Sequence, residues 1–194
     1  SGKKIAYLSD KDNDRYGRTD LFIYEMQDST HKKIKSGVKS TPAWINDSLL
    51  VYSKISKPDK NGSKYFDLYS YDLVEEEEKQ LTFGSRIYSP IYNPKTKQII
   101  GLNTYDGTSN IVVGNEDFSE YDILTDFNDG MYIYSISTYQ ENYIVDAVIN
   151  HERNLYIIDS KTGQLDDFIV KPWDIRDQEY VDNMLIYSDD KQGI

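Results

Sequence analysis

The sequence predicts an all-β chain built from repeated units of four short antiparallel strands. Residues 67–72 (DLYSYD) alternate buried and exposed positions, as a half-buried strand does. This stretch begins with Asp or Asn and recurs at Asp20, Asp67, Asn110 and Asn154, in steps of 47, 43 and 44 residues. No helical period accompanies it. Self-similarity at this spacing is typical of a β-propeller, in which stacking buries the faces of four-stranded blades.

Turn residues and apolar stretches delimit the strands within a unit. Residues 79–82, 88–92 and 98–102 are expected to be strands, and 93–96 (NPKT) a tight turn. Residues 75–78, four consecutive glutamates, are expected to form a solvated turn. A further series starts at Pro42-Ala43-Trp44 and returns at Pro90-Ile91-Tyr92, each followed by an apolar strand.

Composition limits both the core and the partners. Hydrophobic residues make up only 38% of the 194, but 18 are tyrosines, so we expect a core of Tyr, Ile, Leu and Val on strands. A net charge of −11 argues against nucleic acid or anionic membranes as partners. Cysteine is absent, which excludes disulfides and a cysteine nucleophile. No apolar run approaches the ~20 residues of a membrane-spanning helix, and the start of the chain does not resemble a signal peptide.

Several of these segments resemble TolB-like β-propeller repeats, a WD-like repeat that also occurs in the propellers of dipeptidyl peptidase IV and prolyl oligopeptidase. The resemblance covers the whole chain. It is strongest over residues 40–110 and weaker after Met131. The segments that carry it are residues 42–47 (PAWIND), 49–52 (LLVY), 67–72 (DLYSYD), 81–82 (LT) and 105–110 (YDGTSN).

The resemblance implies a division of the chain into blades. In the family the Pro-aromatic strand lies innermost and the Leu-Thr strand outermost. Residues 38–84, 85–126 and 130–170 would then be complete blades, whereas 1–37 and 174–194 would be incomplete ones. Rings of this type usually have six to eight blades. We therefore expect the chain to be an excerpt of a larger propeller, with the remaining blades of its ring as its neighbours.

Two long polar loops are candidates for a partner surface. Residues 10–19 and 54–65 occupy equivalent places in successive blades and should emerge on one face of the ring. Loop tips without fixed structure are the alternative. The residues expected to contact a protein or peptide are Asp10, Asp12, Asp14, Tyr16, Arg18, Lys57, Asp59, Lys60 and Asn61.

The first of these loops is also a weak candidate for calcium. Asp10, Asp12 and Asp14 have the one-three-five spacing of oxygen ligands. However, Arg15 stands where a calcium loop has glycine, and Leu21 where it has glutamate. A solvated hairpin loop without a metal is the alternative, and we expect no other cofactor.

The channel along the propeller axis is a second candidate surface. Pro42, Ala43, Ser89 and Pro90 lie on predicted innermost strands and are expected to line it. Trp44 and Tyr92 lie on the same strands. Packing between blades is favoured over a ligand platform for these two rings.

No catalytic constellation is found in the sequence. His151-Glu152 resembles the start of the zinc motif H-E-x-x-H, but it lacks the second histidine and precedes a predicted strand. There is no G-x-S-x-G nucleophile elbow. With two histidines in the whole chain, few groups could perform acid–base catalysis.

These observations favour a non-enzymatic scaffold that binds a protein or peptide. The resemblance implies a larger bacterial protein of the periplasm or cell envelope. The alternative is the gating propeller of a prolyl oligopeptidase-type serine peptidase, whose catalytic domain would lie outside these residues. A polysaccharide lyase of this repeat type is a third possibility, but it requires a cluster of histidines and carboxylates.

The predicted blade stacking can be tested at Trp44. If this ring is inter-blade core, Trp44→Ala should lower the free energy of unfolding by roughly 3–5 kcal/mol, because it empties a large packed position. Denaturant titration measures the change. A loss below about 1 kcal/mol would show that Trp44 is not core.

Overall fold

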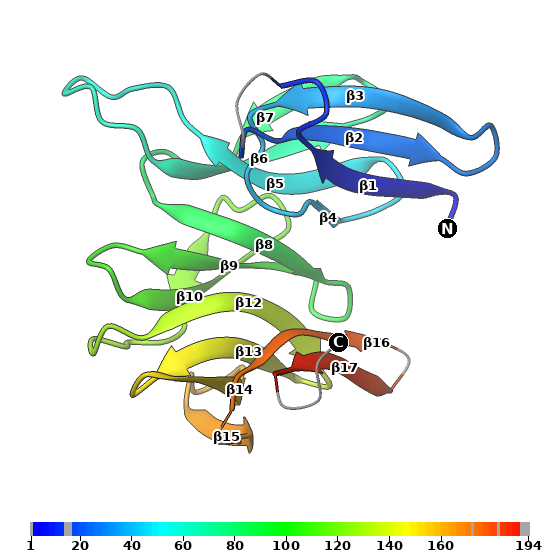
Figure 1. Ribbon diagram of the computed structural model, residues 1–194. Helices are drawn as coiled ribbons and strands as arrows, with labels where there is room; N and C mark the ends of the chain where they lie inside the picture. Colours follow the sequence, from blue (N-terminus) through cyan, green and yellow to red (C-terminus); the bar gives the residue numbers. More distant parts are fainter. Residues whose placement is uncertain (1, 14–16, 172, 182, 191–194) are drawn as a thin grey trace. The chain divides into compact units, whose positions relative to one another are not determined.

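The structure, a computed structural model, describes residues 2–13, 17–171, 173–181 and 183–190. These residues form strands and turns and contain no helix (Figure 1). No helix capable of crossing a bilayer is therefore present in the described ranges. Three four-stranded sheets are accompanied by one three-stranded and one two-stranded sheet. The predicted fold class, a partial β-propeller with three complete and two partial blades, is confirmed.

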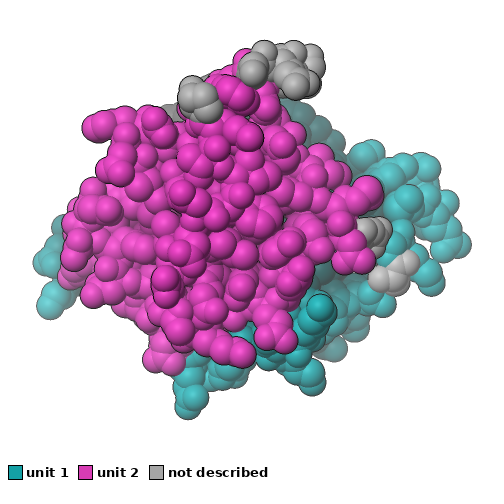
Figure 2. All heavy atoms as spheres, turned by 90° about the horizontal axis from the view of Figure 1, so that it is seen from below, with its two compact units in different colours: residues 1–101, 114–120 teal, residues 102–113, 121–194 magenta. Residues whose placement is uncertain are grey.

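The chain divides into two compact units, coloured separately in Figure 2. Unit 1 comprises residues 1–101 and 114–120. Unit 2 comprises residues 102–113 and 121–194.

Unit 1 holds the first two sheets. The three-stranded sheet has the order β1(Lys4–Ser9), β2(Asp20–Glu25) and β3(Thr30–Ser36). The next sheet has the order β4(Ala43–Trp44), β5(Leu49–Ile55), β6(Phe66–Asp72) and β7(Glu77–Gln80). All pairs are antiparallel and consecutive in sequence. Each sheet is thus a simple meander, as expected of a blade.

The third sheet repeats this meander. Its strands are β8(Ile87–Asn93), β9(Gln98–Thr104), β10(Ser109–Gly114) and β11(Tyr121–Ile123), hydrogen-bonded in sequential order. The expected turn at residues 93–96 lies between β8 and β9, where the side chain of Asn93 accepts a hydrogen bond from the backbone N–H of Lys95.

Unit 2 contains the remaining two sheets. One has the order β12(Tyr132–Tyr139), β13(Asn142–Ile149), β14(Glu152–Ile158) and β15(Leu165–Ile169). The other pairs β16(Ile175–Val181) with β17(Met184–Asp189).

Glu152 begins strand β14, as the sequence predicted, and does not lie on a zinc-binding helix. Arg153 binds the buried carboxylate of Asp146 through Nε at 2.7 Å, so the charged residue beside the false motif is structural.

The core of unit 1 joins its first two sheets. Leu21 and Ile23 of β2 cluster with side chains of β5 and β6, and tyrosine supplies much of the buried ring area, as expected. The tyrosines concerned are Tyr52, Tyr69 and Tyr71. Trp44 packs against this cluster but remains partly exposed. The cost of Trp44→Ala should therefore fall near the lower end of the expected range.

One hydrogen bond recurs at the start of the third strand of each four-stranded sheet and at its counterpart in the first sheet. The side chain of Asp20, Asp67, Asn110 or Asn154 accepts the backbone N–H of the residue 17 positions later. The N···O distances are 3.1, 3.0, 2.7 and 3.0 Å in that order. The donors, Gly37, Gly84, Phe127 and Lys171, follow the last strand of each sheet. We call this hydrogen bond the exit tie, because it fixes the chain where it leaves one blade.

Asp67 forms the most extensive exit tie. Its buried carboxylate also accepts hydrogen bonds from the backbone N–H and hydroxyl of Ser85 and from the hydroxyl of Thr82, each at 3.0 Å. Thr82 in turn accepts the N–H of Leu68 at 2.9 Å. In the third sheet, Asn110, Thr125 and Ile111 repeat this arrangement.

The run of four glutamates differs from expectation. Only Glu75 and Glu76 belong to the turn, whereas Glu77 and Glu78 begin β7. Glu78 is half-buried, and its carboxylate accepts the phenol O–H of Tyr52 at 2.5 Å. The local sequence does not show this contact, because Tyr52 lies far from Glu78 along the chain. The strand ends at Gln80, whereas the sequence predicted that it would continue to Thr82.

Loss of the Asp67 tie should destabilise the fold. Asp67→Ala removes the acceptor from several buried donors, so we expect the free energy of unfolding to fall by about 2–4 kcal/mol in denaturant titration. Asp67→Asn keeps one acceptor oxygen, as Asn110 does naturally, and should cost less. The matched control is Asp72→Ala, which loses turn hydrogen bonds to Val74 and Glu75 and should cost about 1 kcal/mol or less. Equal losses for Asp67→Ala and Asp72→Ala would contradict the role of the tie.

Candidate functional site

A cavity of about 910 Å³ in unit 1 is lined by several positively charged side chains. Five cationic side chains line it, whereas Glu78 is the only carboxylate among its described lining residues. We call it the basic cavity, and its cations are Arg18, Lys39, Lys54, Lys57 and Lys64. They come from three separate segments of a chain whose net charge is −11.

The connection between β3 and β4 positions the first two cations. Gly37, whose positive φ of 76° suits glycine, donates its N–H to the carbonyl of Thr19 at 3.1 Å. The Thr19 hydroxyl donates to the carbonyl of Val38 at 2.5 Å, and the Lys39 ammonium donates to the carbonyl of Gly17. Arg18 is therefore held between two anchored neighbours, next to Lys39.

The same connection is tied to β5. The N–H of Lys39 donates to the carbonyl of Ser53 at 2.9 Å, and the N–H of Ser53 donates to the hydroxyl of Ser40 at 2.9 Å. Val38 also pairs with Lys54 in an isolated antiparallel bridge. These bonds bring Lys54 to the cations of the preceding blade.

The loop between β5 and β6 supplies the last two cations and projects far beyond its sheet (Figure 1). It is internally hydrogen-bonded: the N–H of Ser56 donates to the carbonyl of Tyr65 at 2.8 Å. The Asp59 carboxylate accepts the N–H groups of Asn61 and Ser63, each at 2.8 Å. Lys57 and Lys64 thus project from an ordered loop.

Glu78 joins the floor of the basic cavity to the core. Its carboxylate accepts Lys54 Nζ at 2.6 Å and the hydroxyl of Tyr52. Partial burial alone would raise the pKa of Glu78, but the hydrogen bonds from Lys54 and Tyr52 outweigh it and lower this pKa below its usual value. Burial and the Glu78 hydrogen bond raise the pKa of Tyr52 well above its ordinary value, so its hydroxyl remains a donor.

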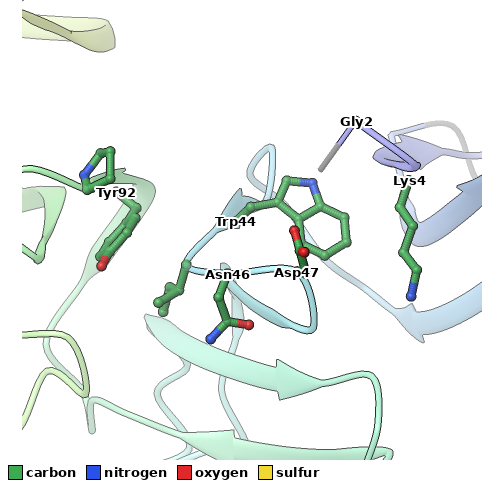
Figure 3. A pocket seen from close by; sticks show the side chains of 8 residues that line it. Gly2, Lys4, Trp44, Asn46, Asp47 and Tyr92 are labelled. Carbon is green, nitrogen blue, oxygen red and sulfur yellow. The ribbon is translucent and has the colours of Figure 1, made fainter.

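A second, smaller cavity of about 330 Å³ lies at the turn between β4 and β5. Figure 3 shows Trp44 projecting between Tyr92 of β8 and Lys4 of β1 in that view. Asn46 also lines it, but its Oδ1 already accepts the N–H groups of Ser48 and Leu49 at 2.9 Å each. The Tyr92 hydroxyl donates to Glu116 at 2.5 Å. The polar groups of Asn46 and Tyr92 thus serve the turns around this cavity.

The predicted partner residues separate into groups. Arg18 and Lys57 line the basic cavity together, and Asp59 lines a smaller neighbouring cavity. Lys60 and Asn61 are exposed at the tip of the loop and line neither. Among the described aspartates of the first loop, Asp10 and Asp12 are exposed and do not line the basic cavity. Asp14 and Tyr16 lie outside the described residues.

The predicted channel residues lie on or beside β4 and β8. Pro42 and Pro90 are buried, whereas Ala43 and Ser89 are partly buried. None of these four residues lines the basic cavity or the smaller cavity beside Trp44. Their place on a channel stays a prediction.

Among the described residues, no three His, Asp or Glu side chains gather in a metal-binding group. Because Asp14 is outside the described ranges, the calcium loop stays a prediction. His31 accepts or donates a hydrogen bond with the Tyr7 hydroxyl at 2.8 Å and packs on Tyr24. His151 is exposed in the turn before β14, and neither histidine lines a described cavity.

Among the charged residues of the basic cavity, Lys39 and Glu78 were not predicted, whereas Lys54 and Lys64 lay within the predicted loop 54–65 without being singled out as contacts. Lys54 and Lys64 bound the predicted loop, and their positive charges were a usable signal. Lys39 lies in a short connection between blades with no distinguishing pattern. Glu78 could not be distinguished from the three glutamates before it, which together were predicted to form a solvated turn.

Comparison with solved structures supports the propeller assignment. A protein assigned as TolB from Agrobacterium tumefaciens superimposes with a TM-score of 0.66 at 18% identity, over 85% of this chain and 60% of that one. TolB from Acinetobacter baumannii gives 0.63 at 20% identity, over 84% and 40%. The fold is that of a TolB-like propeller.

The fold is also similar to part of a peptidase structure. A prolyl endopeptidase structure gives a TM-score of 0.68 at 10% identity, over 97% of this chain and 30% of that one. The chain therefore spans less than two thirds of each of these three structures. No protein-family model matches the sequence, and a search of curated proteins finds no match either.

The paired state of Glu78 should appear in the pH dependence of stability. Because the folded-state pKa of Glu78 is lowered, its contribution is present above the unfolded-state value near 4.5 and is lost as pH falls through the folded-state pKa. The difference in unfolding free energy between the wild type and Glu78→Gln should therefore shrink below about pH 4.5. The control is Glu75→Gln, which changes the charge equally without removing a partner of Lys54 or Tyr52. A pH-independent difference for Glu78→Gln would contradict the assignment.

Proposed function

We propose that this chain is a non-catalytic interaction scaffold within a larger bacterial propeller protein of the periplasm or cell envelope. The basic cavity carries the proposal, because its cations Arg18, Lys57 and Lys64 have no ion-pair partner among the described residues and lie on backbone held by hydrogen bonds. The TolB-like fold supports it, although the fold alone fixes no function. A protein or peptide is the proposed class of partner, and the face formed by the loop between β5 and β6 is its proposed contact site.

Three features explain why this face suits partner binding. The loop between β5 and β6 stands clear of its sheet, and hydrogen bonds within the loop reduce the ordering cost of association. The cavity combines charged rims with the apolar side chains of Ile55 and Pro58. Such a mixture of polar rim and apolar contact is typical of protein interfaces.

Site-specific photo-crosslinking tests this function. The full-length protein carrying a photoreactive amino acid at Lys57 should form a discrete adduct with one polypeptide of the envelope fraction. The same group at Lys95, exposed in the turn between β8 and β9, is the control and should not form that adduct. Identical adducts from both positions, or none from Lys57, would contradict an interaction role for this face.

The second candidate is the gating propeller of a serine peptidase. The superposition of a prolyl endopeptidase over 97% of this chain supports it. A G-x-S-x-G motif elsewhere in the full-length protein, together with hydrolysis of proline-containing peptides by it, would establish this candidate. Absence of both would exclude it.

A further inference from the structure

We propose that the basic cavity binds an acidic peptide segment in which carboxylates alternate with apolar side chains. This inference deepens the proposed function and rests on it. The cations Arg18, Lys57 and Lys64 would pair with the carboxylates, while Ile55 and Pro58 would receive the apolar side chains.

The distribution of charge is the first argument. Lys54 is already neutralised by Glu78, and its ammonium lies 4.2 Å from the centre of the Tyr69 ring. Lys39 donates to a backbone carbonyl, which leaves its charge uncompensated. No ion pair is seen for Arg18, Lys57 or Lys64 within the described residues. Four positive charges therefore face a single cavity, and their mutual repulsion is relieved when an anionic ligand enters.

The lining chemistry indicates which anion fits. A bare phosphate or nucleic-acid backbone would use only the cations. Ile55 and Pro58 would then remain exposed to water, although apolar burial is available there. A long polyanion would also extend past the cavity over a chain of net charge −11 and be repelled. A short peptide with alternating carboxylates satisfies both the cations and the apolar lining.

The geometry of the loop supports an extended peptide. In a strand-like ligand, successive side chains point to opposite sides, so every second residue faces one wall. Lys57 and Pro58 are adjacent on the loop between β5 and β6, and Lys64 returns along its other arm. In an alternating sequence the carboxylates therefore lie on one side of the extended ligand and the apolar side chains on the other, so the two sides can meet the cationic and the apolar lining groups separately.

Fluorescence anisotropy with the full-length protein tests the inference. The probe is a fluorescein-labelled peptide of about eight residues in which glutamate alternates with valine and leucine. We expect it to bind the wild type, and to bind at least about tenfold more weakly to Lys57→Glu/Lys64→Glu. Raising the salt from about 50 to about 300 mM should also weaken binding, because rim charges are screened.

A matched control separates local from global charge. Lys95→Glu/Lys97→Glu changes the net charge by the same amount, but Lys95 and Lys97 are exposed residues of the turn between β8 and β9 and do not line the cavity. We expect this variant to bind the peptide like the wild type. Thermal unfolding followed by circular dichroism verifies that both double variants are folded. A second control peptide, with glutamine in place of every glutamate, should not bind.

Other outcomes would overturn the inference. They include equal weakening in both double variants, binding of the glutamine peptide, and binding of inorganic phosphate or of a single-stranded oligonucleotide in place of the acidic peptide. If the Lys57 crosslink to a partner persists in Arg18→Glu/Lys64→Glu, the scaffold function stands and only the acidic-peptide inference fails. If no crosslink forms at Lys57 while the acidic peptide binds, the proposed polypeptide partner is wrong and the acidic-peptide inference stands.

Discussion

The exit tie is the constraint on which the rest of the structure depends. A buried Asp or Asn oxygen holds the backbone 17 residues downstream, where the chain leaves one sheet for the next. In the first sheet this bond fixes Gly37, and with it the connection that carries Lys39 and anchors Arg18. A buried carboxylate would be costly alone, but several donors compensate Asp67. The interior thus determines where surface charges are placed.

The basic cavity illustrates how a scaffold can acquire a binding site without altering its sheets. Its cations lie on connections and loops, while β5, β6 and β7 provide Tyr69, Glu78 and the strand ends beneath them. Glu78 links the two levels, because the same carboxylate accepts a core tyrosine and a cavity lysine. A change of loop sequence could alter the ligand while leaving this support intact.

Much of the fold could be predicted from the sequence, because the exit-tie residue and the alternating strands recur with each blade. Asp67, Asn110 and Asn154 lie on the third strand of their four-stranded sheets, and Asp20 lies on β2 of the three-stranded sheet. Glu78 could not be placed, since its strand position depends on Tyr52, which lies 26 residues away. The basic cavity was predicted only in part. Arg18 and Lys57 were identified as loop residues, but Lys39 joins them only through tertiary hydrogen bonds to Gly17 and Ser53.

The 17-residue span of the exit tie has a consequence for how such chains evolve. Acceptor and donor both belong to one repeat and its immediate exit, so each repeat brings its own means of directing the chain onward. Duplication or deletion of one whole repeat in the gene leaves every remaining tie with both partners. Ring size can therefore drift between relatives without a compensating change elsewhere, whereas an insertion between the two partners of a tie would have to loop out to preserve it.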